Sequence, residues 1–374
     1  MPSPPTYSAT TVFSPTSEID IAEAAAALRD GHLLAFPTET VYGLGANALT
    51  PSAVSAIFRA KGRPSDNPLI VHVSSLSDLT RWPLTPLPLS PAAARLAKAF
   101  WPGPLTLVLP LAARSPLAAA VTAGLRSVAL RVPKHPVAAA LLAKAAVPVA
   151  APSANRSGRP SPTSAAHVIR DLDGAVFGVV DAGDLALDDA NCGVESTVVD
   201  MTDPHNPSVL RPGAVSVREL ERVSGVPFRE VERGQAVERP KAPGMKYRHY
   251  APVAPMTIVE RTRVKERLEE ERRKGKLVGV LANDAVCEQL REVSGVVTVN
   301  CGREGDVASF ARELYGALRA FDGEGKGRME KVAIILAVPP PDTGDGIGAA
   351  VMNRLVKASA GSVESIPESL KSSH

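Results

Sequence analysis

The chain has 374 residues, of which 45% are apolar and 22% charged, and its formal net charge is only +3. This length predicts two domains of about 100–200 residues each. The small charge argues against a global field for nucleic acid, and no stretch approaches the ~20 apolar residues of a membrane span. Three unclustered cysteines, Cys192, Cys287 and Cys301, argue against a disulfide framework or a zinc site. We therefore expect a cytoplasmic protein with no membrane attachment.

The N-terminal stretch predicts a tail, a helix and a polar loop. Residues 1–17 are rich in Pro, Ser and Thr and read as a disordered tail. A helix capped by Asp20 then ends at Gly31, and a short strand over 32–36 leads into PTETVYGLGAN, residues 37–47. This loop carries hydroxyls and one carboxylate at the carboxyl end of a strand, where α/β sheets bind ligands. A plain glycine-rich connection is the alternative, and we favour a site.

The next stretch, KGRPSDNPLIVH, places two cations on a tight turn. A helix over 51–61 ends at Lys61, and Pro64 keeps Arg63 in extended geometry. Arg supplies a planar donor fork and Lys a compact charge, so the pair suits a polyanion. The strand over 69–73 carries His72, which the pattern alone assigns to a structural role.

A second polar loop follows a later strand. Residues 152–164, PSANRSGRPSPTS, hold five hydroxyls, Asn155 and two arginines between a strand over 147–151 and a helix over 164–172. Hydroxyl and amide donors before a helix can cradle an anion, although a plain polar loop is the alternative. CGVESTVVD then leads into a strand, VLRPG presents Arg211, and Ser216 and Glu219 predict a capping box. We expect Cys192 to be a structural thiol.

The C-terminal part alternates strands and helices, which predicts a parallel sheet wrapped by helices. The charge run over 260–276 reads as the exposed face of its first helix. TGDGIGAA, residues 343–350, is a weak dinucleotide-loop signal. No catalytic residue is expected here. The strands are predicted over 256–259, 277–281, 296–299 and 332–337, and the helices over 263–274, 285–290, 307–321 and 348–358.

Several of these segments occur together in a set that resembles one family. PTETVYGLGANA, KGRPSDNPLIVHV, WPGPLTLVL, LRVPKHP, APSANRSG, ESTVVD and LRPG stand in the order and spacing of the Sua5/YrdC/YwlC family of threonylcarbamoyl-AMP synthases. The resemblance is to the two-domain Sua5 type. It implies an α/β fold: an N-terminal YrdC-like domain with a twisted open mixed sheet and helices, plus a smaller C-terminal Rossmann-like domain. The implied division is a tail over 1–17, a catalytic domain over 18–220, a linker over 221–254, a C-terminal domain over 255–362 and a tail over 363–374.

The resemblance also implies the site residues. Lys61 and Arg63 would be catalytic, and no protein metal site is expected. The implied threonine contacts are Thr40, His72, Arg126, Ala151 and Ser196. The implied ATP contacts are Lys61, Arg63, Asn67, Thr122, Ser153, Asn155, Ser161, Arg211 and, from the linker, Tyr250.

The implied nucleotidyltransferase joins L-threonine, bicarbonate and ATP into threonylcarbamoyl-AMP and pyrophosphate, with Mg²⁺ carried by ATP. The product would pass to a tRNA threonylcarbamoyl transferase that modifies adenosine 37, and direct tRNA binding stays open. Linker residues 242–252 would close over the filled pocket. The alternatives are a double-stranded RNA-binding module and a carbamoyl-transfer domain of the hydrogenase-maturation type.

Overall fold

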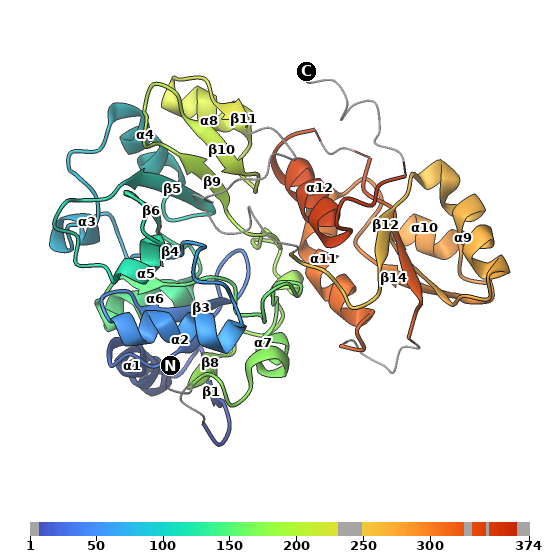
Figure 1. The fold of residues 1–374 in the computed structure, drawn as a ribbon, viewed down its shortest axis with the longest axis horizontal. Helices are drawn as coiled ribbons and strands as arrows, with labels where there is room; N and C mark the ends of the chain where they lie inside the picture. Colours follow the sequence, from blue (N-terminus) through green and yellow to red (C-terminus); the bar gives the residue numbers. More distant parts are fainter. Residues whose placement is uncertain (1–6, 231–248, 325–330, 342–343, 365–374) are drawn as a thin grey trace. The chain divides into compact units, whose positions relative to one another are not determined.

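The computed structural model describes residues 7–230, 249–324, 331–341 and 344–364. These residues form two compact units (Figure 1). Unit 1 contains residues 7–157, 161–185 and 195–230. Unit 2 contains residues 158–160 and 186–194 together with the described residues from 249 onward.

Unit 1 is built on an eleven-stranded mixed sheet with the order β1-β8-β2-β3-β7-β4-β6-β5-β9-β10-β11 among the described residues. Antiparallel pairs such as β2–β3 stand beside parallel pairs such as β4–β6. The strands are β1 (Thr11–Phe13), β2 (Leu34–Phe36), β3 (Gly43–Asn47), β4 (Ile70–His72), β5 (Leu105–Pro110), β6 (Ser127–Arg131), β7 (Val149–Ala150), β8 (Gly178–Val180), β9 (Thr197–Asp200), β10 (Ser208–Arg211) and β11 (Arg229–Glu230).

The helices of unit 1 begin and end where local sequence signals place them. Pro51 opens α2, and Gly62 ends it in a left-handed turn with φ +61°. Ser216 and Glu219 form the expected capping box. The helices are α1 (Glu18–Arg29), α2 (Pro51–Lys61), α3 (Asp78–Arg81), α4 (Pro91–Phe100), α5 (Ala119–Thr122), α6 (Pro136–Ala145), α7 (Ala165–Leu172) and α8 (Val217–Ser224). A 3₁₀ turn over Leu185–Leu187 lies between α7 and α8, and another over Arg261–Arg263 lies in unit 2.

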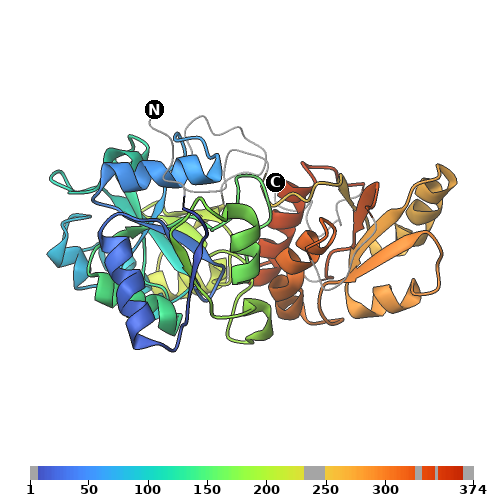
Figure 2. The same cartoon turned by 90° about the horizontal axis from the view of Figure 1, so that it is seen from below.

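Apolar side chains of the unit 1 strands point alternately into two buried clusters. Leu34 and Phe36 pack into one cluster with α1 and α6, which lie side by side (Figure 2). Ala35 and Leu44 belong to a larger cluster that continues into α2 and α4. The alternation follows from the period of two along a strand.

Unit 2 is a four-stranded parallel sheet with the order β12-β15-β13-β14. Helices α11 and α12 lie on one side of it and α9 and α10 on the other (Figure 1). This is the doubly wound α/β arrangement that the sequence predicts. The elements are β12 (Met256–Ile258), α9 (Val264–Arg273), β13 (Val278–Ala282), α10 (Asp284–Gln289), β14 (Val296–Asn300), α11 (Val307–Ala320), β15 (Ile334–Ala337) and α12 (Gly346–Ala358).

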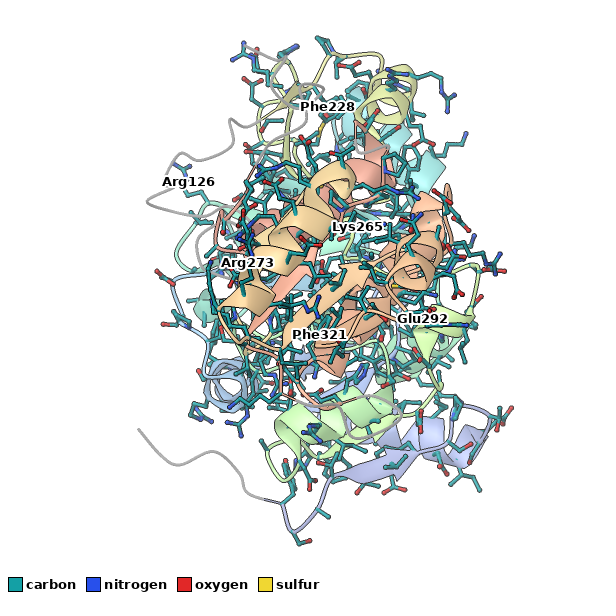
Figure 3. The ribbon with its side chains drawn as sticks, turned by 90° about the vertical axis from the view of Figure 1, so that its right-hand side faces the viewer. Arg126, Phe228, Lys265, Arg273, Glu292 and Phe321 are labelled. Carbon is teal, nitrogen blue, oxygen red and sulfur yellow. The ribbon has the colours of Figure 1, made fainter. Side chains whose placement is uncertain are left out.

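The charge run on α9 forms the exposed face of that helix, as expected. Figure 3 shows Lys265 and Arg273 on this outer face. Glu271 is the exception, because it is buried and accepts hydrogen bonds from Lys274 and Lys276.

Some predictions from the sequence are wrong in detail. Residues 7–17 are not disordered: Thr11–Phe13 pairs with β8 as a strand. The cap of α1 is Ser17, whose hydroxyl accepts from Asp20 N at 3.2 Å, rather than Asp20 itself. Residues 43–47, expected in a loop, form β3 between β2 and β7.

The edges of the predicted linker and C-terminal tail are ordered. Residues 221–230 continue unit 1 as the end of α8 and as β11, which pairs with β10. Val363 pairs with Ile258 of β12. Residues 231–248, with most of the expected closing segment, and residues 365–374 lie outside the described part. Among the helices in the described ranges, none has the length and apolar character needed to cross a membrane.

Candidate active site

The turn after α2 and the segment after β7 meet at Lys61. The Lys61 ammonium donates to the carbonyl oxygen of Ser153 at 2.5 Å and to that of Asn155. The Ser153 hydroxyl donates to Asn155 Oδ1 at 2.5 Å, and Ser157 N donates to the Lys61 carbonyl at 2.8 Å. Both segments are therefore fixed around one buried cation, although they are more than ninety residues apart in sequence.

Arg63 lies on the same turn, with only 9% of its surface exposed. Its guanidinium donates to the carbonyl oxygens of Asn67 at 3.4 Å and Pro68 at 3.1 Å. Asn67 is buried, and its Oδ1 has no hydrogen-bond partner among the described residues. A buried acceptor without a partner costs free energy, so it fits a donor supplied by a ligand or water. Leu69 N donates to Val121 O at 2.9 Å and holds Thr122 nearby.

A second cation, Arg211 at the end of β10, is fixed against Ser196. Its guanidinium donates to the Ser196 carbonyl at 3.1 Å and to the Ser196 hydroxyl at 3.2 Å. That hydroxyl also lies 2.8 Å from Thr106 Oγ1. Beside Ser196, the Glu195 carboxylate accepts from the Ser161 hydroxyl at 2.5 Å. Four strands and loops of unit 1 thus meet in one buried polar cluster.

Thr40 is held by a buried ion pair between Glu39 and Arg131. The Arg131 guanidinium donates to Glu39 Oε1 at 2.7 Å and to Thr40 Oγ1 at 3.1 Å. Burial alone would raise the pKa of the Glu39 carboxyl, but the charge and hydrogen bond of Arg131, with the Lys134 N–H, hold this pKa below its ordinary value. Glu39 is therefore ionised at neutral pH.

His72 lies in β4, opposite Arg131 of β6 in the sheet register. Only 3% of its surface is exposed, and its Nδ1 has no hydrogen-bond partner in the described ranges. Burial, followed by the charge of Arg131, lowers the pKa of His72 to about 3. The imidazole is therefore neutral at physiological pH and suits a hydrogen bond to a neutral hydroxyl or amine.

The loop after β2 connects the Thr40 group to the Lys61 group. Tyr42 N donates to Pro162 O at 2.9 Å, and Ala154 N donates to Tyr42 O at 2.8 Å. Gly43 also forms a bridge with Ser153. The segment after β7 connects the groups around Lys61, Arg211 and Thr40. Its residues Ser153, Ala154, Ser161 and Pro162 make these contacts.

Three predicted residues take no part in the contacts described so far. Arg126 is exposed, and Figure 3 shows its side chain at the edge of the ribbon. Tyr250 belongs to unit 2, where its ring is buried 5.4 Å from the ring of Tyr315. Ala151 lies at the end of β7, and its N–H donates to Ile70 O at 2.9 Å. The threonine and ATP roles of these three residues, like those of the other predicted site residues, stay predictions.

Sequence reasoning missed several residues that position the predicted ones. Glu39 and Arg131 orient Thr40, Thr106 contacts Ser196, and Glu195 holds Ser161. Their partners are 34 to 92 residues away in the chain. One available signal was the position of each polar residue within a buried strand or close to the end of one.

The buried charges favour an anionic ligand. Lys61, Arg63 and Arg211 are each less than a tenth exposed, whereas Glu39 is neutralised by Arg131. These cations are fixed in place by carbonyl and hydroxyl oxygens, which positions them for charge-assisted hydrogen bonds to a phosphate or carboxylate. The Asn67 and His72 side chains add neutral polar groups beside them. A nucleoside polyphosphate next to a small polar molecule fits this chemistry.

Comparisons with known proteins agree across the chain. The family model described as "Telomere recombination" matches residues 26–213, and the one described as "Threonylcarbamoyl-AMP synthase, C-terminal domain" matches residues 215–360. A threonylcarbamoyl-AMP synthase of Bacillus subtilis is 46% identical over 353 residues, covering 93% of this chain and 95% of the relative. One from Pyrococcus abyssi is 45% identical over 344 residues, covering 90% and 93%.

A solved structure agrees as well. The crystal structure of P. abyssi Sua5 complexed with L-threonine superposes with a TM-score of 0.80 at 41% identity and covers 95% of this chain and 98% of that one. The fold class predicted from the sequence is confirmed by this match. The chain belongs to the Sua5 family of threonylcarbamoyl-AMP synthases.

Proposed function

We propose that this protein is a nucleotidyltransferase that makes threonylcarbamoyl-AMP and pyrophosphate from L-threonine, bicarbonate and ATP. The threonine amine first adds to CO₂ and loses a proton, or reacts with bicarbonate with loss of water, and becomes a carbamate. A carbamate oxygen then attacks the α-phosphorus of ATP, the bond from this phosphorus to the bridging oxygen breaks, and pyrophosphate leaves. The single observation that carries the proposal is the group of buried cations fixed within one polar network of unit 1.

Lys61 and Arg63 are the residues that we assign to the phosphates. Both cations are held by carbonyl oxygens, so they need no reorganisation when charge develops on the phosphate oxygens. Arg211 supports the same charge from the other side of the network. Catalysis then depends on positioning and electrostatic stabilisation, as in other phosphoryl-group chemistry.

Thr40, His72 and Ser196 are the residues that we assign to threonine. Each is buried, and Arg131 or Arg211 fixes the two hydroxyls. A neutral His72 would accept or donate a hydrogen bond to threonine. Without a charge, it would not form an ion pair with the threonine carboxylate. Arg126, Ala151 and Tyr250 keep the roles that the family resemblance implies.

The remaining assignments follow from the reaction. Mg²⁺ enters bound to the triphosphate and keeps water ligands, so we count it with the substrate. The product passes to a tRNA threonylcarbamoyl transferase for the modification of adenosine 37, in the cytoplasm. These assignments rest on the family and on the chemistry of the product.

The test is product formation by two variants. Purified protein is incubated with L-threonine, bicarbonate and Mg·ATP, and pyrophosphate release and the mass of the adenylate are measured. Lys61→Ala and Arg63→Ala should each lower the rate by at least about 10²-fold, because removing one preorganised charge donor commonly costs that much. Lys98→Ala, an exposed lysine of α4, is the matched control and should keep the wild-type rate.

Circular dichroism of both variants checks that they are folded. Wild-type turnover by either site variant would contradict the assignment of the cations. Wild-type protein that binds double-stranded RNA but releases no pyrophosphate would instead support the RNA-binding alternative.

A further inference from the structure

Unit 2 contains a cavity of about 220 Å³ at the carboxyl ends of its parallel strands. Three strands end at this edge, since β12, β13 and β15 run parallel. Ligands of open α/β sheets bind outside the carboxyl ends of the strands. The function proposed above assigns no role to this edge. The lining residues come from the ends of these strands and from α10 and α12, and the ones used here are Val259, Glu260, Asn283, Val338, Pro340 and Met352.

The cavity is unsuited to phosphate. Phosphate loops use backbone N–H groups, but the segment after β15 begins with Pro339, Pro340 and Pro341, which have none. Asp345 caps α12 and accepts from Gly346 N at 2.6 Å, which places a negative charge at that helix start. Arg261 at the rim pairs with Glu304. The glycine-rich run at the start of α12 is therefore not a dinucleotide loop.

One carboxylate of the lining is available to a ligand. Glu260, two residues beyond β12, is half-buried, and its carboxylate makes no hydrogen bond or ion pair with the described residues. β12 is the neighbour of β15, so this acid lies at the carboxyl edge of the sheet, where α/β sheets bind their ligands. The Oδ1 atom of Asn283 caps α10, because it accepts a hydrogen bond from Val286 N at 3.1 Å. The side-chain NH₂ group of Asn283 is therefore the part that can donate to a ligand.

The remaining walls are apolar. Val259, Val338 and Met352 are almost fully buried, and Pro340 is buried beside them. A flat apolar ring can pack against such walls while hydroxyls reach the carboxylate. The volume is below the ~300–1,000 Å³ of drug-sized pockets, so the ligand is small.

We propose that unit 2 binds an uncharged ribonucleoside in this cavity, with Glu260 accepting from the ribose hydroxyls and the base packed against Pro340 and Met352. The site is separate from the ATP site of unit 1 and does not rest on the proposed function. Its ligand differs from ATP because the carboxylate and the prolines disfavour a phosphate.

Photolabelling of the full-length protein with 8-azidoadenosine tests this. An excess of Mg·ATP and threonine fills the ATP site, and the labelled peptides are identified by mass spectrometry. Label should appear in peptides that contain 258–262, 283–286, 338–341 or Met352, and unlabelled adenosine should compete while AMP should not. Glu260→Gln should lower this labelling about tenfold or more, because a charged hydrogen bond is lost.

Glu288→Gln is the matched control, since this exposed glutamate lies on α10 outside the cavity lining and should label like wild type. Three results would overturn the proposal: label confined to unit 1 peptides, competition by AMP as strong as by adenosine, or full labelling of Glu260→Gln. Competition by ribose alone at the adenosine concentration would overturn the nucleoside assignment.

Discussion

Arg131 and Glu39 form a fully enclosed ion pair whose role is to position Thr40. Removing one partner of such a pair leaves an uncompensated buried charge, which costs about 3–5 kcal/mol. Arg131→Met should lower the free energy of unfolding of unit 1 by this amount and also lower turnover, because Thr40 loses its donor. Urea unfolding followed by tryptophan fluorescence measures the first effect.

The double variant Glu39→Gln/Arg131→Met separates the cost of an unpaired buried charge from the other effects of losing Arg131. It removes both charges, so it should recover part of the lost stability but none of the lost turnover. If the free energy of unfolding of Arg131→Met lies within about 0.5 kcal/mol of the wild-type value, the ion pair has no structural role.

His72 makes the free energy of unfolding of unit 1 depend on pH, and the sign of this dependence follows from its pKa. Its pKa is about 3 in the folded protein against about 6.5 when unfolded, so the unfolded chain binds a proton that the folded chain does not. The contribution to stability is fully present above pH ~6.5 and is lost as the pH falls toward 3. Between pH 6 and 4, wild type should lose about 1.4 kcal/mol per pH unit more than His72→Gln.

The measurement is the urea midpoint of both proteins at several pH values. His205→Gln changes an exposed histidine and should run parallel to wild type. Parallel curves for His72→Gln as well would contradict a buried neutral imidazole.

At the scale of elements, the sequence predicts those whose signals are local. The proline at the start of α2, the glycine after it and the capping box of α8 each act within a few residues, and each was located correctly. β3 was missed because GLGAN has poor strand propensity. It is a strand because β2 and β7 pair with it on both sides, and β7 lies more than a hundred residues further along the chain, so this pairing leaves no local signal.

The capping box of α8 allows a prediction about one element. Ser216 Oγ accepts from Glu219 N at 3.3 Å, and the Glu219 carboxylate accepts from Ser216 N at 3.0 Å. Ser216→Ala should lower the free energy of unfolding by about 1 kcal/mol. Turnover should stay at the wild-type level, because Ser216 makes no contact with the site network. Ser216→Asp, which can also cap, is the control and should keep the stability of wild type; a loss as large as that of Ser216→Ala would contradict the capping role.

For the molecule as a whole, the sequence predicts which loops carry polar groups but not which of them touch. Lys61 and Arg63 were found from one short motif, yet the contact of Lys61 with Ser153 and Asn155 spans more than ninety residues. The ion pair of Glu39 and Arg131 has the same separation, and although the two residues lie in the segments PTETVYGLGANA and LRVPKHP, neither segment indicates the contact. Such contacts follow from the order of the strands in the sheet. The sequence pattern of a single strand does not encode this order.

Two units with separate apolar cores also predict how the molecule responds to its substrates. Both tryptophans, Trp82 and Trp101, lie in unit 1, so their fluorescence reports that unit. Mg·ATP with threonine at 100-fold over Kd should stabilise unit 1 by about 2.7 kcal/mol and raise its fluorescence-detected Tm by about 5–10 °C. Glu271→Gln, which leaves Lys274 and Lys276 of unit 2 without their carboxylate, should lower a transition seen by circular dichroism while the fluorescence Tm stays fixed. A fluorescence Tm that follows Glu271→Gln, or that ignores the substrates, would contradict the assignment of the substrate site to unit 1.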